Sequence, residues 1–184
     1  MFTRSNIKQM TKINNNFKKT KQAYIDWLNT FPWTFFLTGS TRYELTLKSN
    51  RRLIDRWYNG FLVEPCRSNN YTPYFHPGIK TKSSRLFWVS EPFELKDGCH
   101  GHGLLYLPGY DRDRDQAVYT KLIDHWQLVT GNKGRDRDTW NALNLSLYNP
   151  KRGGGGYCSK YIMKDGADYD LFFYHSLNIE KMPA

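Results

Sequence analysis

The sequence predicts an α+β domain, in which helices pack against a central antiparallel or mixed β-sheet. Segments with helical spacing of apolar residues alternate with short β-type segments, the order expected for this class. Asp97-Gly98 joins two β-type segments and is a strong hairpin signal, so part of the sheet must be antiparallel. The 184 residues suffice for one substantial core. We expect a basic arm and helix over residues 1–30 and a folded domain over 31–184.

The charge of the chain predicts its class of partner, and its cysteine content predicts its cellular compartment. The net charge of +10 at pH 7 attracts polyanions such as nucleic acid. No apolar run approaches the roughly 20 residues that span a bilayer, and the N-terminus has no apolar signal core. We therefore expect a nucleic-acid partner and no membrane. Three cysteines without CxxC spacing indicate free thiols in a reducing cytosol, which predicts a cytoplasmic protein.

Three helices are predicted before the last part of the chain. The first covers about 15–29 and follows a basic segment without acids, which either grips a phosphate backbone or is only a solvated arm. The second has Ser49 as its N-cap and buries one apolar face up to about residue 61. The third covers about 119–129 and ends at Gly131.

The β-type segments fall at five places in the chain. They cover 33–38, with an extension over 43–47 beyond a bulge at Gly39, then 85–93, 99–107, 142–148 and an edge strand at 172–174. The charged tract Asp111–Asp115, before the third helix, is expected to be a solvated turn.

Two histidines in the predicted hairpin form a candidate metal site. His100 and His102 are two residues apart on a strand, so both side chains leave the same face. A two-residue Asp97-Gly98 turn would pair Lys96 with Cys99 and place Glu91 on that face, diagonal to His102. Two imidazoles and a carboxylate would leave open positions for phosphate oxygens and water. We predict a divalent cofactor, Mn²⁺ or Mg²⁺. The mixed nitrogen and oxygen donor set suits Mn²⁺, accepts Zn²⁺ well and Mg²⁺ poorly, and the sequence does not select among them.

Other interpretations of the histidines remain open at this point. A one-residue difference in the turn would replace Glu91 by Glu94, and His76 in the proline-rich loop is another candidate ligand. As an alternative to metal binding, the two histidines are ordinary polar residues on a half-exposed face of the sheet. Cys99 points away from both, which counts against a Cys-His zinc site.

The last predicted helix, about 157–165, follows a run of four glycines and carries a candidate nucleophile. Tyr157 and Tyr161 share one face at i and i+4, and the Lys160 ammonium can reach the same region. A tyrosine with a pKa of about 10 is almost fully protonated at neutral pH, and a nearby cation favours the phenolate. The alternative is an amphipathic helix that buries both tyrosines in the core.

The two motifs together resemble those of the HUH endonuclease superfamily, and within it the rolling-circle replication initiators. His100–Tyr106 is similar to the metal motif of that family, and Tyr157–Lys164 is similar to its YxxKYxxK nucleophile motif. Phe35–Thr38 occupies the place of a less specific first motif. The resemblance covers roughly 33–165. One departure is Gly101, where the family usually has a bulky apolar residue.

The resemblance implies a ferredoxin-like or RRM-like central sheet, with a metal site on neighbouring strands and the tyrosine helix beside it. His100, His102 and Glu91 would then bind the ion that polarises a scissile phosphate. The implied activity is nicking and rejoining of single-stranded origin DNA in rolling-circle replication.

The implied chemistry is tyrosine transesterification. Tyr157 would attack first, forming a 5′-phosphotyrosine link and releasing a 3′-hydroxyl, and Tyr161 would attack at the second nick. Lys160 would steady the phosphate. By the same resemblance, Arg51, Arg52, Arg56 and Lys164 are expected to contact the DNA strand.

The expected partners are single-stranded DNA at an origin and a separate host helicase and polymerase, because no GxxxxGK[ST] motif occurs. A phage or plasmid replicating in a bacterial cell is the expected setting. Two alternatives remain: an HUH transposase or relaxase of a mobile element that uses one tyrosine, and a non-catalytic RRM-like nucleic-acid-binding protein.

Overall fold

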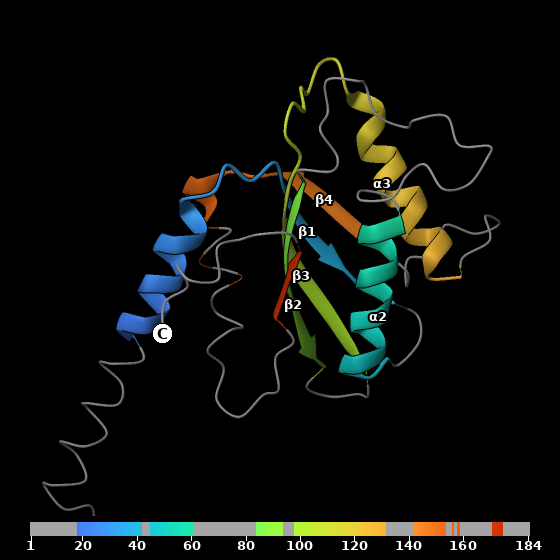
Figure 1. Ribbon diagram of the computed structural model, residues 1–184, viewed down its shortest axis with the longest axis horizontal. Helices are drawn as coiled ribbons and strands as arrows, with labels where there is room; N and C mark the ends of the chain where they lie inside the picture. The colour runs from blue at the N-terminus through green and yellow to red at the C-terminus, as the bar shows by residue number, and fades with distance from the viewer. Residues whose placement is uncertain are drawn as a thin grey trace, which may run out of the picture.

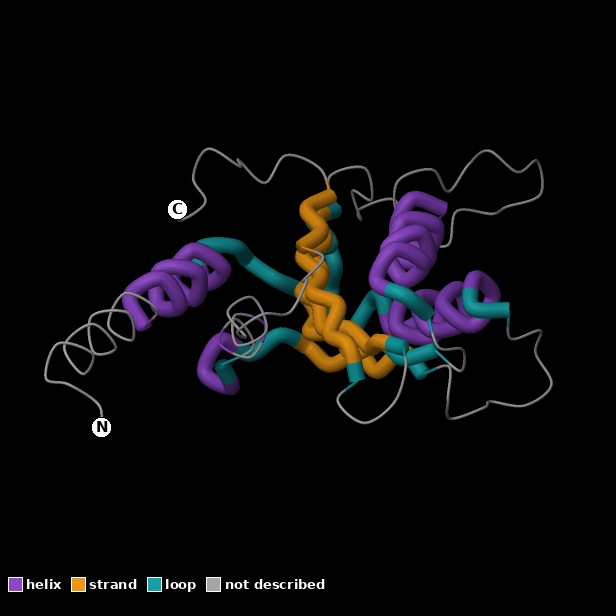
Figure 2. Tube along the Cα trace, turned by 90° about the horizontal axis from the view of Figure 1, so that it is seen from below, coloured by secondary structure: helices purple, strands orange, loops and turns teal. Residues whose placement is uncertain are grey.

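The computed structural model of this chain describes residues 18–41, 45–60, 84–93, 98–131, 142–153, 156, 158 and 171–174. Within these ranges a five-stranded sheet lies between helices, as the ribbon in Figure 1 and the turned view in Figure 2 show. Every strand pair is antiparallel. The predicted class, α+β with a central antiparallel sheet and flanking helices, is confirmed.

The strands match the predicted β-type segments closely. Their bounds are β1 Phe35–Gly39, β2 Arg85–Pro92, β3 Cys99–Tyr106, β4 Leu143–Leu147 and β5 Leu171–Tyr174. They lie in the order β4-β1-β3-β2-β5, so β5 is an edge strand as predicted. The expected extension over 43–47 is wrong at its end, because Leu47 is already helical; Arg42–Glu44 lie outside the described residues.

Two helices cover one face of the sheet. They are α2, Leu47–Tyr58, and α3, Gln116–Val129. In chain order β1, α2, β2, β3, α3 and β4 form the β-α-β-β-α-β arrangement of ferredoxin-like folds, with β5 added beside β2. Residues 18–29 are helical and lie on the other side of the sheet (Figure 2). No helix in the described ranges has the length and apolar character needed to cross a membrane.

Each face of the sheet has its own apolar cluster because successive strand residues point to opposite sides. The cluster under α2 and α3 includes Leu37, Trp57, Trp88 and Trp126 among its buried residues. The cluster on the opposite face consists of Trp27, Leu28, Trp33, Phe87, Val89, Leu104 and Cys158. We call this opposite face the histidine face, since His100 and His102 share the orientation of Leu104 on β3.

Gly101 is a glycine because Trp88 occupies the space beside it. A Cβ on Gly101 would lie 2.3 Å from Trp88 Cε2, and one on Gly103 would lie 2.6 Å from Trp88 Cε3. On the neighbouring strand, a Cβ on Gly39 would lie 2.7 Å from the same indole. Three glycines on β1 and β3 therefore leave a flat backbone surface on which the Trp88 indole of β2 packs. The space beside Gly101 is thus filled by a residue of the adjacent strand.

The helix α2 begins three residues earlier than a Ser49 cap would place it. Thr46 is the N-cap, and its Oγ1 accepts a hydrogen bond of 3.2 Å from the backbone N–H of Ser49. Threonine and serine are both good N-caps, and here the threonine occupies the cap position. The predicted Ser49 cap is therefore wrong, although the helix itself is confirmed.

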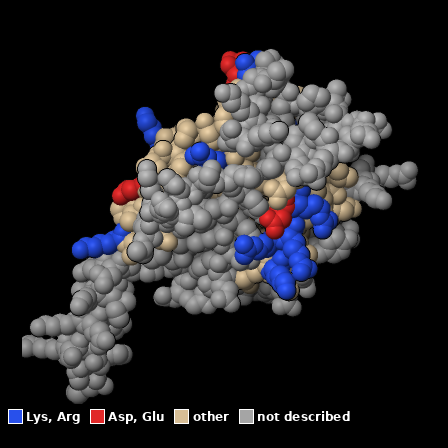
Figure 3. All heavy atoms as spheres, viewed as in Figure 1, with Lys and Arg blue, Asp and Glu red and all other residues tan. Residues whose placement is uncertain are grey.

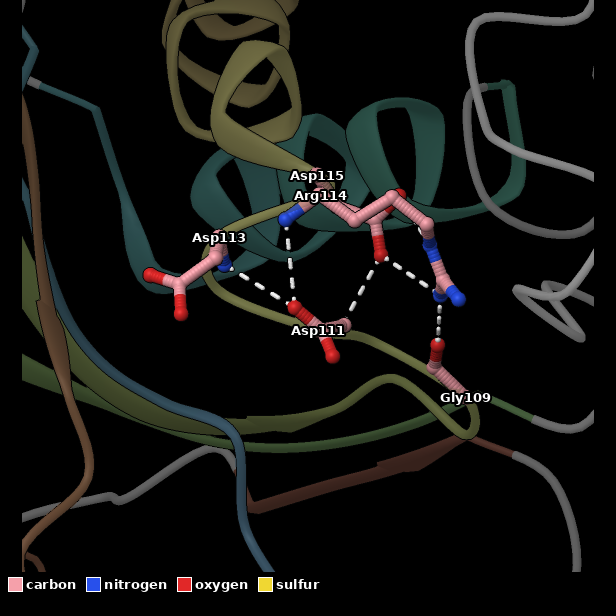
Figure 4. Close-up of polar contacts among 5 residues, drawn as sticks. All are labelled: Gly109, Asp111, Asp113, Arg114 and Asp115. Atoms are coloured by element: carbon pink, nitrogen blue, oxygen red, sulfur yellow. Dashed lines mark hydrogen bonds and ion pairs between the residues drawn. The ribbon is translucent and has the colours of Figure 1, made fainter.

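The charged tract Asp111–Asp115 before α3 is a turn held by hydrogen bonds from its own side chains, rather than a freely solvated one (Figure 4). The Asp111 N–H donates to Asp115 Oδ2 at 2.8 Å, and the Asp113 N–H donates to Asp111 Oδ1 at 2.9 Å. Arg114 bridges Asp115 Oδ2 and the Gly109 carbonyl at 3.0 and 2.8 Å. Asp115 is only 4% exposed, so the solvated turn that we predicted is wrong at this residue.

Candidate metal centre

Three residues of the β2–β3 hairpin come together on the histidine face. Glu91 lies directly opposite His100 in the strand register, and His102 is opposite Val89. One potential ligand atom from each of Glu91, His100 and His102 lies within 4.8 Å of the other two. The predicted site residues are therefore adjacent, and the group can hold a metal ion.

The register that produces this contact differs from the predicted one. Pro92, rather than Lys96, is the partner of Cys99, and the Phe93 N–H donates to the Gly98 carbonyl at 3.1 Å. The two-residue turn is therefore wrong. Because the shift is an even number of residues, it preserves which side chains share a face. Glu91 remains diagonal to His102 and comes directly opposite His100. Glu94 and His76, the alternative ligands, lie outside the described residues.

Aromatic rings and one hydroxyl orient the two imidazoles. Phe93 stacks on His100 with ring centroids 4.9 Å apart and planes at 22°. Phe36 stacks on His102 at 6.3 Å and 19°. The Thr38 hydroxyl lies 3.2 Å from His102 Nδ1. When Nδ1–H donates to this oxygen, Nε2 carries the lone pair that can ligate a metal, the arrangement in which an outer residue sets the tautomer of a ligand.

Two of the three potential metal ligands, Glu91 and His102, are buried, and burial makes an uncompensated charge on them unfavourable. Glu91 is 7% exposed and His102 is 4% exposed. Glu91 Oε2 lies 3.3 Å from His100 Nε2, so the carboxylate and imidazole compensate one another when the histidine is charged. A carboxylate removed from water needs such a partner or a cation. Two nitrogens and one carboxylate are a suitable ligand set for a divalent transition metal.

Cys99 does not contribute to this group. Its thiol is buried and donates to the Leu45 carbonyl at 3.2 Å, under the opposite face of the sheet. The expectation that Cys99 points away from both histidines is confirmed.

Cys158, the residue that follows the predicted nucleophile in the chain, lies on the histidine face. Cys158 is fully buried there in one cluster with Val89 and Leu104, which lie next to His102 across and along the strands. Burial raises the pKa of the Cys158 thiol far above its usual range. Tyr157, Lys160, Tyr161 and Lys164 lie outside the described residues.

The predicted DNA-contacting arginines lie on the other side of the molecule. Arg51, Arg52 and Arg56 are exposed on α2, and Figure 3 shows basic side chains gathered over this helix. Since α2 covers the face opposite the histidines, the structure does not bring these three together with Glu91, His100 and His102, which we call the metal group because they could hold an ion.

Sequence reasoning missed a cavity beside His102. It has a volume of about 310 Å³ and lies against β1, β4 and the short 3-10 helix η3, Pro150–Arg152. Its lining includes Phe36, Thr38, His102 and Arg152. The one available signal was the basic turn that follows the fourth predicted strand, Asn149-Pro150-Lys151-Arg152.

Comparison of the chain with protein-family models, curated proteins and solved structures finds no match.

Proposed function

We propose that this protein nicks and rejoins single-stranded origin DNA by metal-assisted tyrosine transesterification, as an initiator of rolling-circle replication. The observation that supports this most directly is the juxtaposition of Glu91, His100 and His102 on one sheet face. Cys158, the residue after Tyr157 in the chain, is buried in the same face. The basic charge of the chain suits a DNA substrate.

In this proposal Glu91, His100 and His102 hold a divalent ion, with Mn²⁺ preferred over Mg²⁺ because two donors are imidazoles. When bound, such an ion supplies positive charge beside the oxygens of the scissile phosphate. The protein's own part is to present the donors in fixed orientations. Thr38 sets the His102 ring, and Phe36 and Phe93 hold the two ring planes.

The covalent step conserves the number of phosphodiester bonds. The Tyr157 phenol oxygen forms a bond to phosphorus, and the bond from phosphorus to the 3′-oxygen breaks. The phenol proton is balanced by the proton of the 3′-hydroxyl that leaves. Lys160 supports the charge on the phosphate, and Tyr161 performs the second attack, which joins the strand without ATP.

The partners proposed are single-stranded DNA at the origin of a phage or plasmid and a separate host helicase and polymerase. The 3′-hydroxyl released in the first step is the end that a polymerase extends. The basic residues Arg51, Arg52 and Arg56 remain predicted DNA contacts. Because they are exposed on α2, over the face opposite the histidines, we propose that they contact DNA away from the cleavage site.

The deciding experiment incubates the protein with end-labelled single-stranded DNA carrying the replicon origin and Mn²⁺. We expect a covalent protein–DNA adduct on denaturing gels, and mass spectrometry should locate it on Tyr157. Tyr157→Phe should abolish the first nick, and Tyr161→Phe should abolish joining. If one tyrosine proves silent in both reactions, a one-tyrosine transposase or relaxase replaces the initiator.

Glu91→Gln tests the metal group separately from DNA. It should weaken Mn²⁺ binding in calorimetry by at least about tenfold, because loss even of an outer-shell partner costs about 10–100-fold. Asp124→Asn, at an exposed acid of α3, is the matched control and should leave Mn²⁺ affinity unchanged. Equal affinities in both variants would contradict the proposed site.

A second candidate function is favoured by the β-α-β-β-α-β order, which RNA-recognition modules also use. In that case the protein binds single-stranded nucleic acid without cleaving it. A gel shift that survives EDTA, with no adduct in Mn²⁺, would select this function.

A further inference from the structure

The cavity beside His102 combines three kinds of lining group. Phe36 contributes an aromatic ring and Tyr148 a second one, while Ser146 and Thr38 contribute hydroxyls. Arg152 contributes a positive charge. A volume of about 310 Å³ is near the lower end of the range for small-molecule pockets, about 300–1,000 Å³. The cavity is therefore suited to one small, flat, anionic ligand.

The rigid parts of the lining are fixed by contacts outside the cavity. The Tyr148 hydroxyl donates to Asn29 Oδ1 at 3.0 Å, which ties the ring to the helix over 18–29. The Tyr148 N–H donates to the Thr34 carbonyl at 2.9 Å. Asn149 caps η3 by accepting a hydrogen bond of 2.9 Å from the Lys151 N–H, and this cap sets the start of the turn that carries Arg152.

The cavity and the metal group share a residue. His102 belongs to both, and Thr38, which contacts His102 Nδ1, also lines the cavity. A ligand in the cavity is therefore one side chain away from the ion that Glu91, His100 and His102 would hold.

We propose that this cavity binds the nucleotide that flanks the scissile phosphate, with its base against Phe36 and Tyr148 and a phosphate oxygen on Arg152. Base–aromatic stacking and an arginine–phosphate contact are the two interactions that single-strand binding sites combine. The inference rests on the proposed function, since it names the part of the DNA that the metal group acts beside.

The test is binding of single deoxynucleoside 5′-monophosphates to the whole protein in EDTA, followed by amide chemical shifts in NMR. We expect shifts at Thr38, Ser146 and Asn149. Arg152→Gln should weaken this binding about tenfold. Lys151→Gln, which removes a charge from the same turn but not from the cavity lining, should change it less than about twofold. Equal losses in the two variants, or shifts confined to other regions, would overturn the proposal.

A second arm tests the role of the base. Deoxyribose 5-phosphate has the anion but no base, so it should bind several-fold more weakly than the nucleotides. Tyr148→Leu should remove most of that difference, with thermal unfolding as the check that the variant is folded. If the sugar phosphate binds as well as the nucleotides do, the base is not recognised and the inference fails.

The nucleotide-binding test and the nicking assay can succeed or fail independently of one another. Nucleotide binding that depends on Arg152, without any covalent adduct, would support the cavity and contradict the nicking function. Nicking that is unchanged in Arg152→Gln, in both KM and kcat, would support the function and contradict the cavity.

Discussion

At Gly101 the chain has no side chain because a neighbouring strand supplies a large one. The indole of Trp88 lies over Gly101 and Gly103, and it packs on Trp126 with ring centroids 6.0 Å apart. The ring is thus held from both sides. From the sequence resemblance we expected a bulky apolar residue at position 101. The space beside Gly101 is instead filled by Trp88 of β2, the strand that pairs with the one carrying His100 and His102.

This packing predicts that Gly101→Ala is destabilising. The new Cβ would lie 2.3 Å from Trp88, and an indole confined by Trp126 cannot move away freely. We expect a loss of about 1–3 kcal/mol in the free energy of unfolding, as for other overpacked cores. Urea unfolding followed by tryptophan fluorescence measures it.

Gly60→Ala is the matched control for this prediction. The nearest atom to its Cβ would be His125 Nε2 at 3.5 Å, an ordinary contact. We expect a change within about 0.5 kcal/mol. A Gly101→Ala variant as stable as Gly60→Ala would show that Trp88 does not fill the space that the structure assigns to it.

At the scale of the elements, the hairpin shows which property of a strand is local and which is not. The alternation of side chains depends only on the strand itself, so His100, His102 and Glu91 were assigned to one face correctly. The pairing depends on the length of the connection, and there the Asp97-Gly98 signal was misleading. An even shift changed the neighbour of each residue and left its face unchanged.

The cap of α2 provides a test at the same scale. Thr46→Ala should cost about 1 kcal/mol of unfolding free energy, because the Ser49 N–H loses its side-chain acceptor. Ser49→Ala removes only the exposed hydroxyl contact with Thr46 and should cost less than about 0.5 kcal/mol. Denaturant unfolding of the two variants measures both values. A larger loss in Ser49→Ala would restore Ser49 as the cap.

At the scale of the whole molecule, the sheet separates two kinds of surface. The metal group, the cavity and Cys158 belong to the histidine face, whereas α2 carries Arg51, Arg52 and Arg56 on the far side. A single strand bound at the metal group would therefore have to pass around a sheet edge to meet α2. Charge alone predicted a nucleic-acid partner but did not predict this division of the surface.

Protection of Cys158 from alkylation tests whether this residue packs on the histidine face. Burial raises the pKa of its thiol, so at pH 8 the folded protein holds less of the reactive thiolate than the unfolded chain does. We expect Cys158 to resist iodoacetamide in the native protein and to react once guanidinium unfolds it. Peptide mass spectrometry measures the two rates. Similar rates in both states would contradict the packing.

Apart from the β-type extension predicted up to Leu47, the sequence by itself determined the types of the elements described above, the edge strand and the shared face of Glu91, His100 and His102. These follow from the periods of helices and strands, which each segment carries within itself. Only the tertiary structure decided the strand register, the Thr46 cap, the packing of Trp88 on the three glycines, and the cavity that Arg152 and His102 both line. Each of those depends on which distant segments meet, and close packing between them selects one arrangement among several that the local pattern allows.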